Sequence, residues 1–190
     1  MAITPDTKDW TWSVERRCPE CGEDASRIRP EQVPDLVRDG ARQWVRVLTT
    51  SPAVHDRPSS DTWSPLEYAC HVRDVFRVFD GRLQSMLEQD NPTFENWDQD
   101  DAAVEQPYSE QDPGAVANEL QQAAESVAAR FAGISPDGWT RSGRRGDGAV
   151  FTVTTLARYV LHEVAHHLHD VRFAHPGRGD SVTGSGGGNA

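Results

Sequence analysis

The chain has 190 residues, of which 36% are hydrophobic, and its formal net charge at pH 7 is −11. This length favours one domain with a single core, and the acidic balance argues against general binding of nucleic acid and against docking on anionic membranes. No apolar run reaches the roughly 18 residues of a membrane helix, and no N-terminal stretch has the basic-then-apolar order of a signal peptide. We therefore expect a soluble, cytoplasmic protein.

Residues 1–29 are expected to form an irregular arm that contains the turn "CPECG". Cys18 and Cys21 in this turn have the spacing of half a zinc ribbon, but the chain has only one further cysteine, Cys70. Three cysteines are too few for a disulfide scaffold, and no strand-and-helix context supports a redox role. We favour a turn with two free thiols. The alternative is a zinc site completed by histidines or by a second subunit.

Four segments with helical periodicity follow the arm, at about 30–50, 65–89, 113–133 and 152–171. The second has the clearest start, since Ser64 can cap it and Glu67 completes a capping box, and Asp112 can cap the third. No segment reads as a convincing strand, so we predict an all-α four-helix bundle over residues 30–173. The two long connections before the second and third helices are placed to cover one end of it. Residues 174–190 are rich in glycine and serine, which predicts a disordered tail.

The stretch "YVLHEVAHHLHDV" holds four of the seven histidines and two overlapping metal-site patterns. One is the HExxH form of zinc hydrolases, in which His162 and His166 bind the metal and Glu163 acts as general base. The other is the pair Glu163 and His167. A hydrolase of the HExxH type needs a further downstream ligand, yet no glutamate follows Glu163, and Arg172 stands where one such class places its third histidine. An HExxH-type metallohydrolase is therefore a distant alternative.

A helical wheel separates the two patterns, because successive residues are about 100° apart. Glu163 and His167 fall on the flank of the apolar face, whereas His162, His166 and His169 fall opposite it and are expected to be solvated. His71 lies on the corresponding flank of the second helix. A set of His71, Glu163 and His167 would leave coordination positions open for water or substrate, as catalytic metal sites require. Asp74, one turn after His71, is interpreted as an exposed helix charge.

At this point the chain resembles the DinB-like proteins, which include the mycothiol-dependent maleylpyruvate isomerases. "TWSPLEYACHVRDVFRVFDGRL" is similar to their second helix, "LARYVLHEVAHHLHDV" to their fourth, and "FENWDQDD" to a tract between the second and third. The resemblance implies a four-helix bundle with metal ligands at His71, Glu163 and His167, and Asp170 as a trailing polar residue. Shifting the alignment by one residue would make the helix-4 pair His162 and His166.

The resemblance also implies a divalent metal, zinc or nickel, that helps to activate a low-molecular-weight thiol such as mycothiol, bacillithiol or glutathione. The thiolate would attack a small electrophile, which predicts a thiol transferase or isomerase. Lys8 is the only lysine among the 19 basic side chains. Such arginine-rich composition is typical of a GC-rich genome and favours an actinobacterial, mycothiol-using source. No acid or base stands out. The alternative is a non-catalytic metal-binding or stress-associated bundle that acts as a homodimer or through a partner. Trp63, Trp97 and Trp139 lie in or beside loops that could roof the site.

Overall fold

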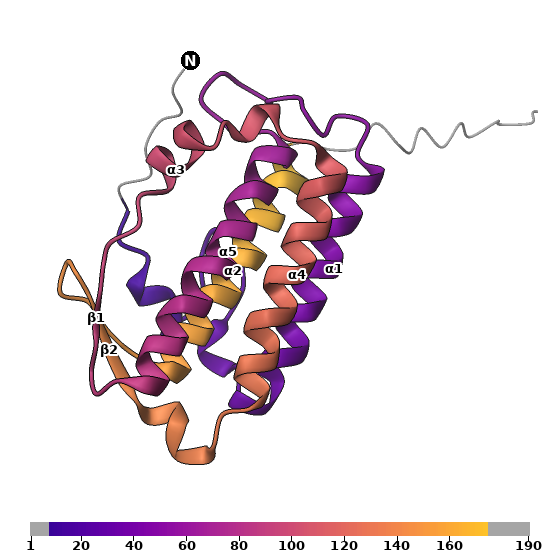
Figure 1. Ribbon diagram of the computed structural model, residues 1–190. Coiled ribbons are helices and arrows are strands. Elements are labelled where there is room, and N and C mark those ends of the chain that lie inside the picture. The colour runs from indigo at the N-terminus through magenta and orange to yellow at the C-terminus, as the bar shows by residue number, and fades with distance from the viewer. Residues whose placement is uncertain (1–7, 175–190) are drawn as a thin grey trace, which may run out of the picture.

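Four long helices form the body of the protein: α1 (Val33–Thr50), α2 (Pro65–Glu88), α4 (Pro113–Ala132) and α5 (Val153–Ala174). In this computed structural model, which describes residues 8–174, they pack into one bundle (Figure 1). The expected start signals are present. Ser64 and Glu67 make the reciprocal capping box of α2, and Asp112 accepts a hydrogen bond of 2.8 Å from the backbone N–H of Ala115. The all-α four-helix bundle is therefore confirmed.

The directions of the helices decide where the two long connections go. Helices α1 and α5 run one way along the bundle and α2 and α4 run the other way (Figure 1). Because α2 and α4 are parallel, the chain between them must return along the whole bundle, and it forms the short helix α3 (Gln99–Glu105) on the way. The start of α2 and the last turns of α5 consequently lie at the same end of the bundle, with α3 beside the start of α2 (Figure 1).

The expectation of no strand is wrong in detail. Three short strands, β1 (Thr93–Phe94), β2 (Ser142–Arg145) and β3 (Val150–Thr152), form a sheet beside the bundle in which β1 is parallel and β3 antiparallel to β2. Strands of two to four residues are too short for an alternating pattern to be visible. The pairing of β1 with β2 also joins segments far apart in the chain, which no local signal reports.

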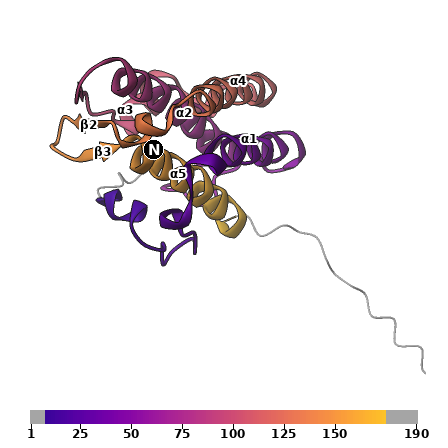
Figure 2. The ribbon, with the colours of Figure 1, turned by 90° about the horizontal axis from the view of Figure 1, so that it is seen from below.

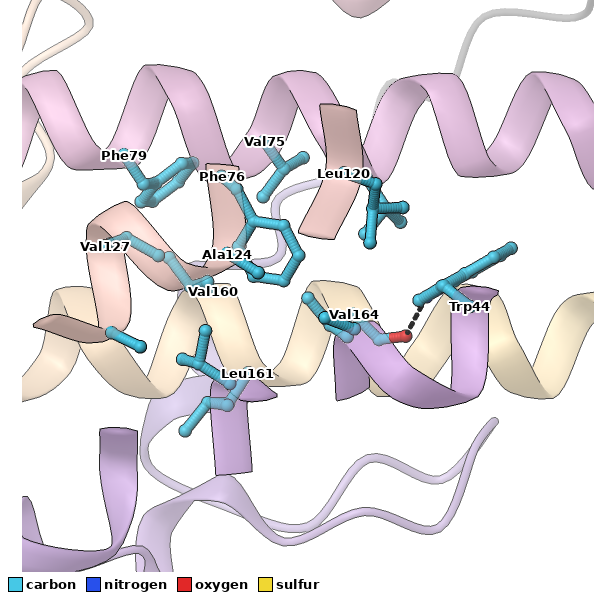
Figure 3. Packing of buried hydrophobic residues seen from close by; sticks show 14 of the residues in the cluster. Trp44, Val75, Phe76, Phe79, Leu120, Ala124, Val127, Val160, Leu161 and Val164 are labelled. Carbon is cyan, nitrogen blue, oxygen red and sulfur yellow. Dashed lines mark hydrogen bonds between the residues drawn. The ribbon is translucent and has the colours of Figure 1, made fainter. Parts of the chain in front are cut away.

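The core lies between the four helices, where Phe76, Leu120 and Val160 pack together (Figure 3). Helix α5 approaches α1 closely at Gly40, because a Cβ placed on that glycine would lie 2.6 Å from Cγ1 of Val164. One turn further along α1, the Trp44 indole N–H donates a 3.2 Å hydrogen bond to the Val164 carbonyl (Figure 3). These two contacts set the distance and the rotation of α5 against α1.

The described part of the N-terminal arm folds back onto α5 rather than standing apart from the bundle. It contains the short 3-10 helices η1 (Thr11–Val14) and η2 (Ala25–Arg27), and it buries Val14, Cys18 and Ala25. Figure 2 shows the arm lying along the side of α5. The predicted tail, residues 174–190, falls outside the described residues except for Ala174, where α5 ends. None of the helices between residues 8 and 174 combines the length and the apolar character that a membrane span requires.

The close approach at Gly40 generates a paired prediction. Gly40→Ala should lower the free energy of unfolding by about 1–2 kcal/mol, because overpacking against Val164 exceeds the gain in helix propensity. Gly81→Ala is the matched control, since Gly81 is an exposed helical glycine whose added Cβ would meet no atom within 4 Å. It should raise stability by about 0.5–1 kcal/mol. Urea unfolding of both variants measures the difference, and equal effects would contradict the packing described here.

Candidate metal centre

Three potential metal ligands converge from two helices at the covered end of the bundle. His71 lies in the second turn of α2, while Glu163 and His167 lie one turn apart on α5. The Glu163 Oε2 atom is 3.4 Å from His167 Nε2 and 3.8 Å from His71 Nε2. One ligand atom from each of the three side chains lies within 4.8 Å of the other two. This is the set that the helical wheel selected from the sequence.

The chemistry of this set fits a divalent cation. Both ring nitrogens of His71 are buried without a hydrogen-bond partner, which is costly unless something binds them. Burial lowers the pKa of His71, which keeps the imidazole neutral and able to donate a lone pair. Burial alone would raise the pKa of Glu163, but the neighbouring imidazoles of His167 and His71 outweigh it and hold this pKa far below its usual range. A neutral imidazole beside a buried carboxylate is a donor set that zinc and related ions prefer.

Asp170 orients the third side chain of the set. Its Oδ2 atom is 3.0 Å from His167 Nδ1, on the ring nitrogen that faces away from Glu163. Burial works against a charged imidazole, but Asp170 and Glu163 together raise the pKa of His167 to about 9. A carboxylate on the far nitrogen of a metal-binding histidine is a recurrent arrangement that fixes the ring and its tautomer. The predicted trailing residue therefore has a physical role.

A cavity of about 370 Å³ opens onto two members of the donor set, His71 and Glu163. Its walls include His71 and Glu163 together with Tyr159 and two guanidinium groups, those of Arg82 and Arg145. Arg145 is paired with Asp147, whereas no carboxylate among residues 8–173 lies within ion-pair distance of Arg82. Burial, assisted by the charge of Arg145, lowers the pKa of Arg82 to about 10. The cavity thus presents the buried guanidinium of Arg82 close to the converging donors, and the carboxylates of Asp98 and Asp147 also line it.

Two tryptophans cover this end, as the sequence suggested. The Trp97 ring stacks on His71 with centroids 5.5 Å apart and an interplanar angle of 10°, and Trp63 packs at 5.4 Å from the same imidazole. Trp139 does not take part, since it stacks on Phe131 instead, near the opposite end of α4. The roof over His71 is therefore aromatic on two sides.

Comparison with known proteins agrees with this architecture. The model of the DinB superfamily matches residues 35–171. The chain belongs to the DinB superfamily.

Two solved structures share the fold of this superfamily member. YfiT from Bacillus subtilis, described as a probable metal-dependent hydrolase with an unusual four-helix bundle topology, superposes with a TM-score of 0.68 and 14% identity over 77% of this chain and 86% of its own. A variant of mycothiol-dependent maleylpyruvate isomerase superposes with a TM-score of 0.61, also at 14% identity, over 77% of this chain and 62% of that one. At this identity the likeness shows the fold alone. Comparison with curated proteins found no match.

Within this DinB fold, Asp74 is not the exposed charge that the sequence suggested. It is 5% exposed and accepts hydrogen bonds from the Tyr108 hydroxyl (2.7 Å) and the Arg73 guanidinium (2.9 Å). Arg73 also donates to Gln111, which ties the returning connection to α2. The expectation was wrong because the connection covers this face of α2, which a single-helix wheel treats as solvent.

The expectation that His162 and His166 are solvated is also wrong. Their exposed fractions are 2% and 7%, and only His169, with 30% of its side chain exposed, fits the predicted polar stripe. The Trp10 ring covers both, with centroids 4.8 Å from His166 and 5.7 Å from His162. The wheel placed these rings correctly on the side of α5 that faces away from the bundle, but the N-terminal arm occupies that side.

His162 and His166 also belong to a second group of donors, which includes Cys18 and Cys21 of the arm. Neither thiol is part of a disulfide, and the grouping matches the alternative interpretation of the turn, in which histidines complete the donor set. His162 and His166, the alternative pair, therefore do form a donor group, but with Cys18 and Cys21 of the arm. Glu163 belongs to the other group, with His71 and His167. Arg82 and Arg145 were missed at the sequence level, because no motif marks them among many arginines.

The burial of the histidines predicts their reactivity toward diethyl pyrocarbonate, followed by peptide mass spectrometry. Exposed His55 should be modified first, and His71, His162 and His166 last. Trp10→Ala should speed the modification of His166 and leave that of His71 unchanged, because the Trp10 ring covers His166 whereas Trp63 and Trp97 cover His71. Modification of His162 and His166 at the rate of His55 in the wild type would contradict the described packing of the arm.

Proposed function

We propose that the protein is a metal-dependent thiol transferase or isomerase whose divalent cation, zinc or nickel, is held by His71, Glu163 and His167. The observation that carries the proposal is the convergence of one buried and two half-buried donors, with both nitrogens of His71 lacking a hydrogen-bond partner and a cavity opening onto His71 and Glu163. Three protein ligands leave coordination positions open, which distinguishes a catalytic site from a structural one.

The cation would lower the pKa of a bound low-molecular-weight thiol of the mycothiol type, so that the thiol reacts as thiolate at neutral pH. The chain's own side chains provide orientation and a dry surrounding. Asp170 holds the His167 ring in place, and the rings of Trp97 and Trp63 keep water away from His71.

The thiol and a small electrophile would then react in the cavity. The electron pair of sulfur forms the new S–C bond, and the thiol proton is released to solvent. In a transfer, the leaving group departs with the electron pair of the bond that breaks. In an isomerisation across a carbon–carbon double bond, the π electron pair shifts onto the adjoining electron-withdrawing group as the S–C bond forms. After rotation about the resulting single bond this pair restores the double bond, the S–C bond breaks with its electron pair on sulfur, and the thiolate is regenerated.

The cavity favours an electrophile that carries a negative charge. Arg82 is buried, unpaired with any carboxylate of the described chain, and held between the rings of Phe79 and Phe94 at 4.9 and 5.1 Å. A carboxylate of the substrate would supply the missing counter-charge, which is the partner that a planar guanidinium binds best. We therefore propose a carboxylate-bearing electrophile.

The superfamily neighbours support metal dependence in general terms. One is described as a probable metal-dependent hydrolase and the other as a mycothiol-dependent isomerase. A hydrolase and a thiol transferase would use the same open site, and they differ in whether water or thiol attacks. The requirement for thiol is therefore the property to measure.

Metal content tests the ligand set. His71→Ala, Glu163→Ala and His167→Ala should each weaken binding at this site by more than the roughly 10–100-fold that loss of an outer partner costs, and Asp170→Asn should fall within that range. His55→Ala, which changes an exposed histidine outside both donor groups, is the control. Competition titration with a chromophoric chelator measures the affinities. Unchanged affinity in His71→Ala would contradict the ligand set.

Turnover tests the reaction. Metal-loaded protein should consume a carboxylate-bearing electrophile only when a thiol is present, and should process its methyl ester more slowly. Arg82→Gln should reduce the difference between acid and ester, chiefly through KM, because the guanidinium binds the carboxylate in ground and transition states alike. Hydrolysis without thiol would identify a hydrolase instead, and metal binding without any turnover would contradict an enzymatic role.

A further inference from the structure

The second donor group has the residue pattern of a structural zinc site. Its cysteines have the spacing C-x2-C and its histidines the spacing H-x3-H, which together match the Cys2His2 class. The two halves are 141 to 148 residues apart in the chain, one in the arm and one on α5. One ligand atom from each of the four residues lies within 4.8 Å of the others.

The distances within the group are close to those that tetrahedral zinc requires. The Cys18 Sγ atom is 3.8 Å from His166 Nδ1, and the Cys21 Sγ atom is 3.8 Å from His162 Nε2. Zinc bonds of about 2.3 Å to sulfur and about 2.05 Å to nitrogen place these atoms about 3.5 Å apart at a tetrahedral angle. These two pairs would need to move by only a few tenths of an ångström, and all four ligand atoms already lie within 4.8 Å of one another.

The "CPECG" turn already holds both thiols toward α5. The Gly22 N–H donates a 3.0 Å hydrogen bond to the Cys18 carbonyl, and the Cys18 N–H donates a 2.7 Å bond to Glu23. Gly22 has a φ of +80°, a conformation that a side chain would strain, so the turn depends on glycine at this position. The turn brings the two sulfurs to one side without any metal.

The group is buried, and its hydrogen bonding is incomplete. Cys18 is 1% exposed, and His162 Nδ1 has no hydrogen-bond partner. The other nitrogen of His162 faces only a thiol sulfur, which is a weak donor and acceptor. The buried imidazole of His162 therefore lacks a strong hydrogen-bond partner at either nitrogen, and a metal ion would supply one.

The charge balance suits zinc as well. One divalent cation with two thiolates and two neutral imidazoles carries no net charge, so its burial costs little electrostatic free energy. The Nε2 atom of His166 lies 3.7 Å from Asp170 and 3.9 Å from Glu20, so carboxylates face the nitrogen that would not bind the metal. This is the outer arrangement expected around a zinc-binding histidine.

We propose a second, structural zinc site that fastens the N-terminal arm to α5, with Cys18, Cys21, His162 and His166 as its ligands. Four protein ligands make it a closed site, in contrast to the three-ligand set on the neighbouring flank of α5. The arm needs such a fastening, because its described part consists of short 3-10 helices with few buried apolar side chains. Asp170 contacts both His166 and His167. The zinc site would therefore also help to fix the position of Asp170 and, through it, the orientation of the His167 ring.

Zinc stoichiometry of the full chain tests the proposal. After zinc loading and gel filtration, the wild type should hold two zinc ions per chain. The double variant Cys18→Ser/Cys21→Ser and the variant His71→Ala should each hold one, from different sites. Cys70→Ser is the matched control, since its thiol is buried in the bundle core and should not affect stoichiometry. A double variant that still holds two ions would overturn the proposal.

Cobalt spectroscopy identifies the ligands without relying on any variant that fails to fold. Cobalt-loaded wild type and His71→Ala should both show thiolate-to-metal charge-transfer absorption, and the double cysteine variant should lack it. Absence of this absorption in wild type overturns the proposal, as does a Cys18–Cys21 disulfide in protein kept under reducing conditions. Because His71→Ala retains the signal only if the second site is independent, failure of the proposed catalytic centre and failure of this site give different results.

Limited trypsin digestion reports the structural consequence. Removal of zinc, or the double cysteine variant, should speed cleavage after Arg27 of the arm, which is exposed. His71→Ala should leave the cleavage rate unchanged. Equal rates with and without zinc in the wild type would overturn the fastening role.

Discussion

Helix α5 contributes ligands to both donor groups because it is packed on two sides at once. One side faces the bundle, where the approach of Val164 to Gly40 and the hydrogen bond from Trp44 set its position and rotation against α1. The other side faces the N-terminal arm. With its rotation fixed in this way, side chains only 100° apart around α5 enter two different environments. Glu163 and His167 turn toward α2, and His162 and His166 turn toward the arm.

The two overlapping i, i+4 pairs in "HEVAHH", His162 with His166 and Glu163 with His167, therefore do not exclude each other. Each pattern supplies one donor group, and the offset of one residue separates the two groups around the helix. Asp170 stands between them and contacts a histidine of each, His167 at 3.0 Å and His166 at 3.7 Å. In our proposals, the three-ligand group of His71, Glu163 and His167 is the catalytic metal site. The four-ligand group holds the N-terminal arm against α5.

Much of the bundle could be predicted from local signals. The capping box at Ser64 and Glu67, the cap at Asp112 and the apolar periodicity of four segments placed the helices within a few residues. The wheel also selected Glu163 and His167 with His71, because the flank of an apolar face is a property of one helix. The short strands and α3 had no such periodic signal, and the burial of Asp74 depends on a connection that packs over α2.

The sequence by itself determined the type and limits of the long helices, the superfamily resemblance and the inward orientation of Glu163 and His167. Spacing along one chain segment decides all of these. Only the tertiary structure decided what covers the outer face of α5. The arm reaches His162 and His166 across 141 to 148 residues of chain, and a contact over such a separation leaves no periodic trace in either segment. For that reason the sequence alone indicated only half of a zinc ribbon at "CPECG". The fold places His162 and His166 beside the two cysteines.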